Sequence, residues 1–337
     1  AKEPLPENRD AEIESPVIAN DLSNQKVTAI AEDTQGHIWI GTFRGLNKNN
    51  VHDYHQYFCT DDSLGLPDNQ ITHLLRDSKN RFWVGTVNGV CLYTDKDNFR
   101  IIPIEADNKN VRQILEDRNG RIFLSTGFQL YAYHPREEKI TCVLPEICTG
   151  NTFYAQCHIA PDNNLWVMTS TGLRCYDLST LQLKESVALS GYPYYSYLHN
   201  NELWITGNHT LSIFDTRTRS FKPLPQPIAQ NTTLCNADID YIHPYGNNGL
   251  LLNTARHGMF YYNPATGSVT RQDENGFPFE MPRFRISRMF TDSQQNLWIG
   301  SVDQGYTVCY HYKERFNNDN YLRSELNNKS VVSLSAG

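Results

Sequence analysis

The chain has 337 residues, of which 39% are hydrophobic and 12% aromatic, which is enough material for a packed core and argues against disorder except at the ends. Its formal net charge of −7 argues against a general nucleic-acid-binding protein, because such proteins carry a basic surface that contacts phosphates. No apolar run approaches the roughly 18 to 20 residues of a membrane span, and no signal peptide opens the sequence, although a removed one would leave no trace.

One sequence motif recurs seven times: it consists of a strand-like run, a turn rich in Asp and Asn, an apolar anchor residue and a second turn. It is clearest in VTAIAEDTQGHIWIGTFRGL from Val27, ITHLLRDSKNRFWVGTVNGV from Ile71 and ISRMFTDSQQNLWIGSVDQG from Ile286. The seven anchors, spaced 38 to 47 residues apart, are Trp39, Trp83, Phe123, Trp166, Trp204, Leu251 and Trp298. A period of about 40 to 50 residues rich in short strands is typical of a β-propeller. The sequence therefore predicts an all-β fold, a seven-bladed β-propeller.

Each repeat is expected to supply one four-stranded blade, read outward from the centre. In the first repeat the predicted strands are residues 27–33, 38–42, 46–49 and 54–58. The Asp-x-x-Gly and Asp-x-x-Asn turns suit a tight hairpin between the first two strands, so we interpret them, like the tryptophan that follows, as structural. No helical periodicity occurs, and we expect no helix longer than a turn or two.

Two segments lie outside this pattern. Residues 1–22 read as an N-terminal arm, and residues 16–22 are expected to close the ring as an outer strand beside residues 308–312, because an open sheet edge invites association. The propeller is expected over residues 23–315. Residues 316–337 read as a linker and the start of a following, truncated propeller, since NKSVVSL from Asn328 echoes NQKVTAI from Asn24.

The eight cysteines show no C-x-x-C pair and no partnered histidine at zinc-binding spacing. Cys91, Cys175 and Cys309 fall at similar places in their repeats, which favours small buried hydrophobes in packed blades, while a disulfide framework stays open. No nucleophile elbow, phosphate loop or calcium loop occurs. We therefore predict no catalytic residue, no metal site and no cofactor.

The pattern D-x-x-G-x-[ILF]-W-[IV]-G-T-x-x-G-[LV], nearly whole in the first, second and seventh repeats, resembles the two-component regulator propeller repeat. The resemblance implies the periplasmic sensor region of a hybrid two-component histidine kinase of Bacteroidetes, anchored in the inner membrane. It also implies a second propeller, an immunoglobulin-like domain, a membrane span and a cytoplasmic kinase in a homodimeric full-length protein. Such receptors sense oligosaccharides and control polysaccharide-utilisation genes. Kinase activity is expected of the full-length protein and not of these residues.

Propeller geometry narrows the search for a ligand site. In each blade the start of the innermost strand and the turn between strands two and three emerge on one face around the channel, where binding loops usually lie. The candidate ligand-binding residues on this face are Arg44, Asn88, Phe128, Tyr154, Tyr195, His209, Arg256, His257, Arg285 and Asp303. Aromatic rings stack on sugar rings, and amide and guanidinium groups bind hydroxyls and carboxylates.

Four arginines map to this face, namely Arg44, Arg256, Arg283 and Arg285, and they favour an acidic oligosaccharide as ligand. The alternative is that Asp238 and Asp303 simply neutralise them. The junction with the following propeller is the competing location for the site.

Two other classes of function remain open. One is a protein-interaction propeller without a small ligand. The other is a propeller lyase or glycosidase. A sialidase is disfavoured because the repeat aspartate precedes its tryptophan by six positions, whereas the sialidase Asp box has five.

Overall fold

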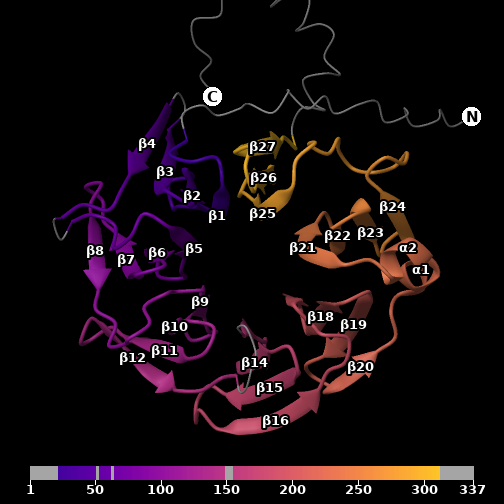
Figure 1. Cartoon of the computed structure of the whole chain (residues 1–337), viewed down its shortest axis with the longest axis horizontal. Coiled ribbons are helices and arrows are strands. Elements are labelled where there is room, and N and C mark those ends of the chain that lie inside the picture. The colour runs from indigo at the N-terminus through magenta and orange to yellow at the C-terminus, as the bar shows by residue number, and fades with distance from the viewer. Residues whose placement is uncertain (1–21, 51–52, 62–63, 149–154, 312–337) are drawn as a thin grey trace, which may run out of the picture.

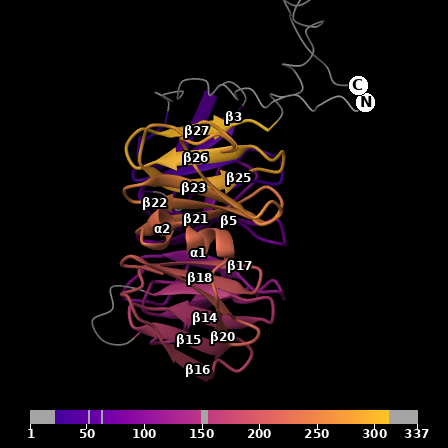
Figure 2. The same cartoon turned by 90° about the vertical axis from the view of Figure 1, so that its right-hand side faces the viewer.

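The computed structural model describes residues 22–50, 53–61, 64–148 and 155–311. In them seven sheets stand around a central opening, and the first blade (indigo) lies beside the last (yellow), as Figure 1 shows. Figure 2 shows the same ring edge on. The predicted all-β, seven-bladed β-propeller is confirmed.

Within each blade the strands are antiparallel and follow one another from the centre to the rim. Blades 1 to 4 consist of β1 (Val27–Glu32), β2 (Ile38–Thr42), β3 (Gly45–Asn50), β4 (Asp53–Tyr57); β5 (Ile71–Arg76), β6 (Phe82–Thr86), β7 (Gly89–Tyr93), β8 (Phe99–Ile102); β9 (Gln113–Glu116), β10 (Ile122–Ser125), β11 (Leu130–His134), β12 (Lys139–Leu144); β13 (Gln156–Ile159), β14 (Asn164–Met168), β15 (Gly172–Asp177) and β16 (Leu183–Ala188).

Blades 5 to 7 consist of β17 (Tyr195–His199), β18 (Glu202–Gly207), β19 (Thr210–Asp215), β20 (Ser220–Lys222); β21 (Ile239–Tyr245), β22 (Gly249–Thr254), β23 (Gly258–Asn263), β24 (Ser268–Arg271); β25 (Ile286–Thr291), β26 (Leu297–Ser301) and β27 (Tyr306–Cys309). The connection between blades 5 and 6 carries two short helices, α1 (Gln226–Gln230) and α2 (Thr232–Cys235). No longer helix occurs in the described ranges, as predicted.

The aspartate of the repeated motif stabilises the hairpin between the first and second strands of its blade. In blade 2, Asp77 Oδ1 accepts hydrogen bonds from the backbone N–H groups of Lys79 (3.0 Å) and Arg81 (2.9 Å). Its other oxygen accepts from Trp83 Nε1 at 2.8 Å. Asp33 and Asp292 bind the anchors of their blades in the same way, at 2.9 Å each. The turns and tryptophans are structural, as interpreted, because one carboxylate satisfies both the turn amides and the buried indole N–H.

The seven anchors pack against the next blade and are at most 7% exposed. Trp39, for example, lies 4.9 Å from Phe82 and 4.7 Å from Tyr93, measured between ring centroids. The predicted burial of the anchors is therefore confirmed, and these rings form much of the contact between adjacent blades.

The glycine of the Trp-Ile-Gly phrase allows a close approach between blades. A Cβ atom on Gly41 would lie 2.5 Å from Ile71 Cγ2 at the start of the next inner strand, and one on Gly300 would lie 2.6 Å from Val27 Cγ1. Both distances are shorter than a van der Waals contact, so the absence of a side chain at these positions permits the spacing of the inner strands.

Blade 7 closes the ring against blade 1. Glu32 accepts hydrogen bonds from Ser293, at 2.8 Å from the backbone N–H and 2.6 Å from the hydroxyl. Leu22, Val27 and Trp298 belong to one apolar cluster that spans this junction. Apart from Leu22, the arm predicted to supply a closing strand lies outside the described residues, as do residues 316–337, so both predictions stand untested.

All eight cysteines are free thiols. Cys91 and Cys175 are fully buried in their blades, as predicted, whereas Cys309 is half-buried. Burial raises the pKa of the Cys175 thiol to about 11, which keeps it protonated at neutral pH and a poor nucleophile.

Candidate functional site

The turns between second and third strands and the starts of the inner strands share one face, as predicted. Backbone hydrogen bonds join the two kinds of segment: Phe43 N–H donates to Lys26 O at 3.0 Å and Val302 N–H donates to Arg285 O at 3.0 Å. The same link recurs in blade 6, where Ala255 N–H donates to Asp238 O at 2.9 Å. We call this surface the loop face.

Eight of the ten candidate residues are exposed on the loop face, namely Arg44, Asn88, Phe128, His209, Arg256, His257, Arg285 and Asp303. They are distributed over blades 1, 2, 3, 5, 6 and 7, so they form a discontinuous rim around the ring. Tyr154 lies outside the described residues. Their role in ligand binding stays a prediction.

Tyr195 differs from the other candidates because it connects two blades. Its hydroxyl lies 3.4 Å from Ile242 O and 3.2 Å from Ile242 N on the inner strand of blade 6. Its ring packs beside Tyr241, with ring centroids 5.9 Å apart. Burial raises the pKa of Tyr195 well above its usual range. The hydroxyl is thus engaged by backbone groups of the channel wall rather than presented to the loop face.

The carboxylates suspected of neutralising the arginines have other partners. Asp238 Oδ1 accepts from the backbone N–H of His209 at 3.0 Å, and the same oxygen lies 3.4 Å from His209 Nδ1. Asp303 accepts from Ser301 Oγ at 3.2 Å. None of Arg44, Arg256, Arg283 and Arg285 forms an ion pair with another described residue. Arg285 and Asp240 nevertheless interact electrostatically, an effect smaller than the burial that raises the pKa of Asp240.

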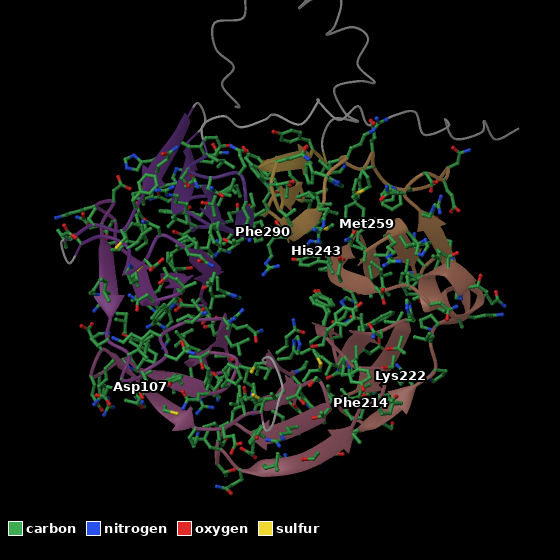
Figure 3. All side chains as sticks on the ribbon, viewed as in Figure 1. Asp107, Phe214, Lys222, His243, Met259 and Phe290 are labelled. Carbon is green, nitrogen blue, oxygen red and sulfur yellow. The ribbon has the colours of Figure 1, made fainter. Side chains whose placement is uncertain are left out.

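The inner-strand histidines are structural. His158 Nε2 lies 2.8 Å from Ser196 Oγ, and His243 Nε2 lies 2.9 Å from Thr291 Oγ1. Burial lowers the pKa of each to about 4, so both are neutral at pH 7. Figure 3 shows His243 and Phe290 beside the central opening and Lys222 on the rim. In the described part of the chain no three His, Cys, Asp or Glu side chains are grouped to hold a metal ion.

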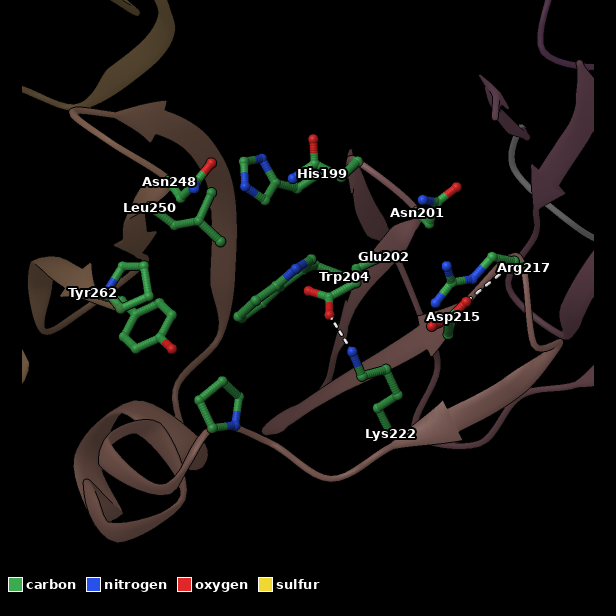
Figure 4. Close-up of a pocket in the computed structure, with 13 residues that line it drawn as sticks. His199, Asn201, Glu202, Trp204, Asp215, Arg217, Lys222, Asn248, Leu250 and Tyr262 are labelled. Atoms are coloured by element: carbon green, nitrogen blue, oxygen red, sulfur yellow. Dashed lines mark hydrogen bonds and ion pairs between the residues drawn. The ribbon is translucent and has the colours of Figure 1, made fainter. Parts of the chain in front are cut away.

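Sequence reasoning missed a cavity of about 380 Å³ between blades 5 and 6. It opens beside the turns between first and second strands, which lie at the opposite end of the strands from the loop face. Its lining (Figure 4) consists of His199, Asn200, Asn201, Glu202, Trp204, Asp215, Arg217, Lys222, Pro225, Asn248, Leu250, Tyr262 and Pro264. We call it the interblade pocket.

Charged groups of both signs line the interblade pocket. Lys222 Nζ donates to Glu202 Oε1 at 2.5 Å. Asp215 Oδ1 accepts from the backbone N–H groups of Arg217 (2.9 Å) and Thr218 (3.0 Å), and these bonds, that from Thr218 foremost, hold the pKa of Asp215 below its usual range. Burial lowers the pKa of His199, which keeps this ring neutral at pH 7. The pocket therefore offers acceptors, donors and aromatic surface within one small volume.

The pocket exists because two rings that touch at other junctions stand apart here. At three other junctions the anchor packs against a ring on the third strand of the next blade: the centroid distance is 4.7 Å for Trp39 and Tyr93, 5.0 Å for Trp83 and Tyr133, and 5.1 Å for Trp166 and Phe214. For Trp204 and Tyr262 it is 6.4 Å. The outer strand of blade 5, β20, has only three residues, so it covers little of this junction.

A signal for the pocket was present in the sequence. The position six residues before the anchor is aspartate in blades 1, 2, 3 and 7, but it is Leu198 in blade 5. Blade 4 also lacks the aspartate, because Ala160 stands six residues before Trp166, yet its rings pack closely at 5.1 Å. The loss of the carboxylate therefore singles out two junctions, and only the structure shows that the pocket lies at the second of them.

Two segments of the chain, residues 21–44 and 65–88, match the family described as two component regulator propeller. The predicted resemblance is thereby confirmed for the first two repeats. A comparison with curated protein sequences gives no match. Among the described residues no helix is long and apolar enough to cross a membrane.

Three solved structures illustrate the fold. The extracellular domain of a hybrid two component system from B. thetaiotaomicron is 20% identical, with a TM-score of 0.71, over 88% of this chain and 41% of that chain. A second such domain from the same bacterium is 16% identical, with a TM-score of 0.68, over 90% of this chain and 43% of that chain. Virginiamycin B lyase from Staphylococcus aureus is 14% identical, with a TM-score of 0.63, over 86% of this chain and 96% of that chain.

These likenesses establish a shared fold. The chain spans less than half the length of the two extracellular domains it resembles. It is a β-propeller that shares its fold with these extracellular domains, and two of its repeats match the regulator propeller family.

Proposed function

We propose that this chain is a non-enzymatic, ligand-sensing propeller of a hybrid two-component receptor and that its ligand is an oligosaccharide. The match of two repeats to the regulator propeller family supports a sensor role, as does the likeness to extracellular domains of two component systems. We place the propeller in the periplasm, on a full-length protein that carries the kinase and controls polysaccharide-utilisation genes. Ligand binding would favour one arrangement of propellers or subunits over another, and thereby shift the population of signalling states.

The interblade pocket is the observation that carries the proposal. Its volume of about 380 Å³ is that of a small-ligand site. Each sugar hydroxyl both donates and accepts a hydrogen bond. Glu202 and Asp215 could accept these bonds, Lys222 and Arg217 could donate them, and Tyr262 offers a ring for the apolar face of the sugar. The pocket holds two carboxylates and two cationic side chains, so it can bind polar ligand groups of either charge.

The loop face is the second candidate location. Its arginines without ion pairs among the described residues suit an acidic oligosaccharide, as the sequence predicts. Contacts with a following propeller and with the membrane-anchored kinase belong to this proposal as well.

The test is calorimetric titration of the 337-residue chain with neutral, acidic and amino-bearing oligosaccharides, preceded by a glycan array. Tyr262→Ala should weaken binding by about tenfold or more, because aromatic anchors dominate such sites. Tyr192→Ala is the matched control, since this tyrosine is 78% exposed and lies outside the pocket. A loss seen instead in an Arg256→Ala, Arg285→Ala double variant would move the site to the loop face. If no glycan binds the wild-type chain, oligosaccharide sensing by this propeller is wrong.

A further inference from the structure

A cationic or amide donor normally stands beside the structural aspartate of a blade. It is the residue two positions before the anchor, directly before the second strand begins. Arg81 Nε donates to Asp77 Oδ2 and Arg121 Nε donates to Asp117 Oδ2, at 2.7 Å each. Asn296 Nδ2 donates to Asp292 Oδ2 at 3.0 Å, and His37 Nδ1 lies 3.1 Å from Asp33 Oδ2.

A cation also covers the rings at the first three junctions. The guanidinium carbon of Arg81 lies 5.2 Å from the centre of Trp83 and 5.3 Å from that of Tyr133. At the first junction Lys48 Nζ lies 5.3 Å from Trp39 and 5.1 Å from Tyr93. Arg121 lies 5.3 Å from the ring of Phe123 at the third. At these three junctions the space between an anchor and the next blade thus holds a positive charge over aromatic rings.

In blade 5 the charges at these two positions differ from those of the other blades just described. The aspartate is replaced by Leu198, and the donor position is held by a carboxylate, Glu202. Trp204 is 2% exposed and its Nε1 has no hydrogen-bond partner in the described structure. No cation of the described residues lies over the ring of Trp204 or Tyr262. Trp166 also lacks an aspartate, but there the ring of Phe214 packs closer, at 5.1 Å.

From this difference we infer that the interblade pocket binds a glycan through a protonated amino group, with Glu202 as its counter-ion and Tyr262 beside it. The ligand class is an oligosaccharide that contains an amino sugar with a free amine. The inference rests on the proposed function, because it specifies the glycan that the sensor recognises.

Lys222 acts as the placeholder for this amine in the unliganded protein. Its side chain is 42% exposed and that of Glu202 is 29% exposed, so their ion pair is screened by solvent and readily exchanged. The other cation of the pocket, Arg217, is exposed and forms no ion pair within the described ranges. Burial lowers the pKa of His199 and Glu202 partly opposes this shift, so burial makes His199 a weaker competitor for Glu202.

The test compares glucosamine oligomers with their N-acetylated counterparts at a pH at which the free amine is protonated. Binding is measured by calorimetry and by the indole N–H signals of the five tryptophans, with Trp204 assigned through Trp204→Phe. The free-amine oligomer should bind at least about tenfold more tightly, a difference of about 1.4 kcal/mol, and should shift the Trp204 signal. Glu202→Gln should abolish the preference for the amine.

Lys222→Met separates this inference from simple hydroxyl recognition. If Lys222 is a placeholder, its removal frees Glu202 and tightens binding of the amino oligomer. If Lys222 instead donates to the ligand, its removal weakens binding, and the inference is overturned. Glu185→Gln is the matched control, since this glutamate pairs with Arg219 at 3.6 Å outside the pocket, and it should change nothing.

Two further outcomes distinguish recognition of the amine from binding of oligosaccharides in general. Equal binding of N-acetylated and free-amine oligomers, with both weakened by Tyr262→Ala, would overturn amine recognition and leave the oligosaccharide sensor intact. Absence of binding by every glycan, while ethylguanidinium shifts the Trp204 signal and Glu202→Gln abolishes that shift, would refute the glycan function and retain the cation site.

Discussion

Asp77 illustrates how one side chain supports a whole blade. Its carboxylate is completely buried and accepts hydrogen bonds from two backbone amides, an indole N–H and a guanidinium. Four donors around one carboxylate offset the cost of removing its charge from water. Where the aspartate is absent, as for Trp166 and Trp204, the indole N–H remains buried without a partner in the described structure.

We expect Asp77→Ala to lower the free energy of unfolding by about 3 kcal/mol. The substitution removes the acceptor of the Trp83 indole and the Arg81 guanidinium and leaves both groups beside a new cavity. Asp162→Ala is the control: Asp162 is exposed and, among the described residues, forms hydrogen bonds only with Asn164, so its loss should cost about 0.5–1 kcal/mol. Urea unfolding followed by tryptophan fluorescence measures both. Equal effects of the two substitutions would contradict the role given to the carboxylate.

At the scale of the strand, the distance between the inner strands of two adjacent blades depends on one residue of the second strand. This residue faces the inner strand of the next blade. In blades 1, 2 and 7 a glycine lies there, and the space that its side chain would fill is occupied by Ile71, Val111 and Val27, respectively. The apolar contact between blades is therefore made by side chains of one blade on backbone of the other.

Gly41→Ala should destabilise the protein by about 1–3 kcal/mol, since its Cβ would lie 2.5 Å from Ile71 Cγ2 and 3.0 Å from Ile71 Cβ. A Cβ atom on Gly85 would lie 3.1 Å from Val111 Cγ1, 3.3 Å from Ile114 Cδ1 and 3.4 Å from Thr72 Oγ1, so the same substitution there should be tolerated within about 1 kcal/mol. Thermal unfolding of both variants tests the comparison. A Gly41→Ala variant as stable as wild type would show that the inner strands can separate freely.

For the molecule as a whole, the junction of blades 7 and 1 is special because residues far apart in sequence form it. Glu32 and Ser293 are 261 positions apart, yet their contact repeats the one between Glu116 and Ser78 at the second junction. The ring is thus closed by the same glutamate–serine contact that joins blades 2 and 3. In addition, Gly305 N–H donates a hydrogen bond to Gln25 O at 2.8 Å.

Glu32→Ala should open this junction more often than Glu116→Ala opens its own, because the blades beside Glu116 are also joined covalently through the chain. Hydrogen exchange followed by mass spectrometry should show faster exchange in β25–β27 for Glu32→Ala, and a smaller, local change for Glu116→Ala. Identical exchange of the last blade in both variants would mean that other contacts carry the closure.

The sequence by itself determined the class of fold, the number of blades, the positions of the anchors and the role of the aspartate turns. These features lie within one repeat: the aspartate and its tryptophan are six residues apart, and the strands they join are adjacent in the chain. Local spacing and hydrogen-bonding capacity were therefore sufficient to predict them, and the family resemblance followed from the same residues.

The interblade pocket was decided only by the tertiary structure. Its walls come from two blades and from the α1–α2 connection, and its existence depends on a distance between Trp204 and Tyr262 that exceeds the corresponding distance at three other junctions by more than 1 Å. Likewise, Tyr195 was placed on the correct strand by sequence, but only packing against blade 6 decided that its hydroxyl bonds to Ile242. Such contacts join residues about 40 to 60 positions apart, and no local pattern specifies how closely two neighbouring blades approach.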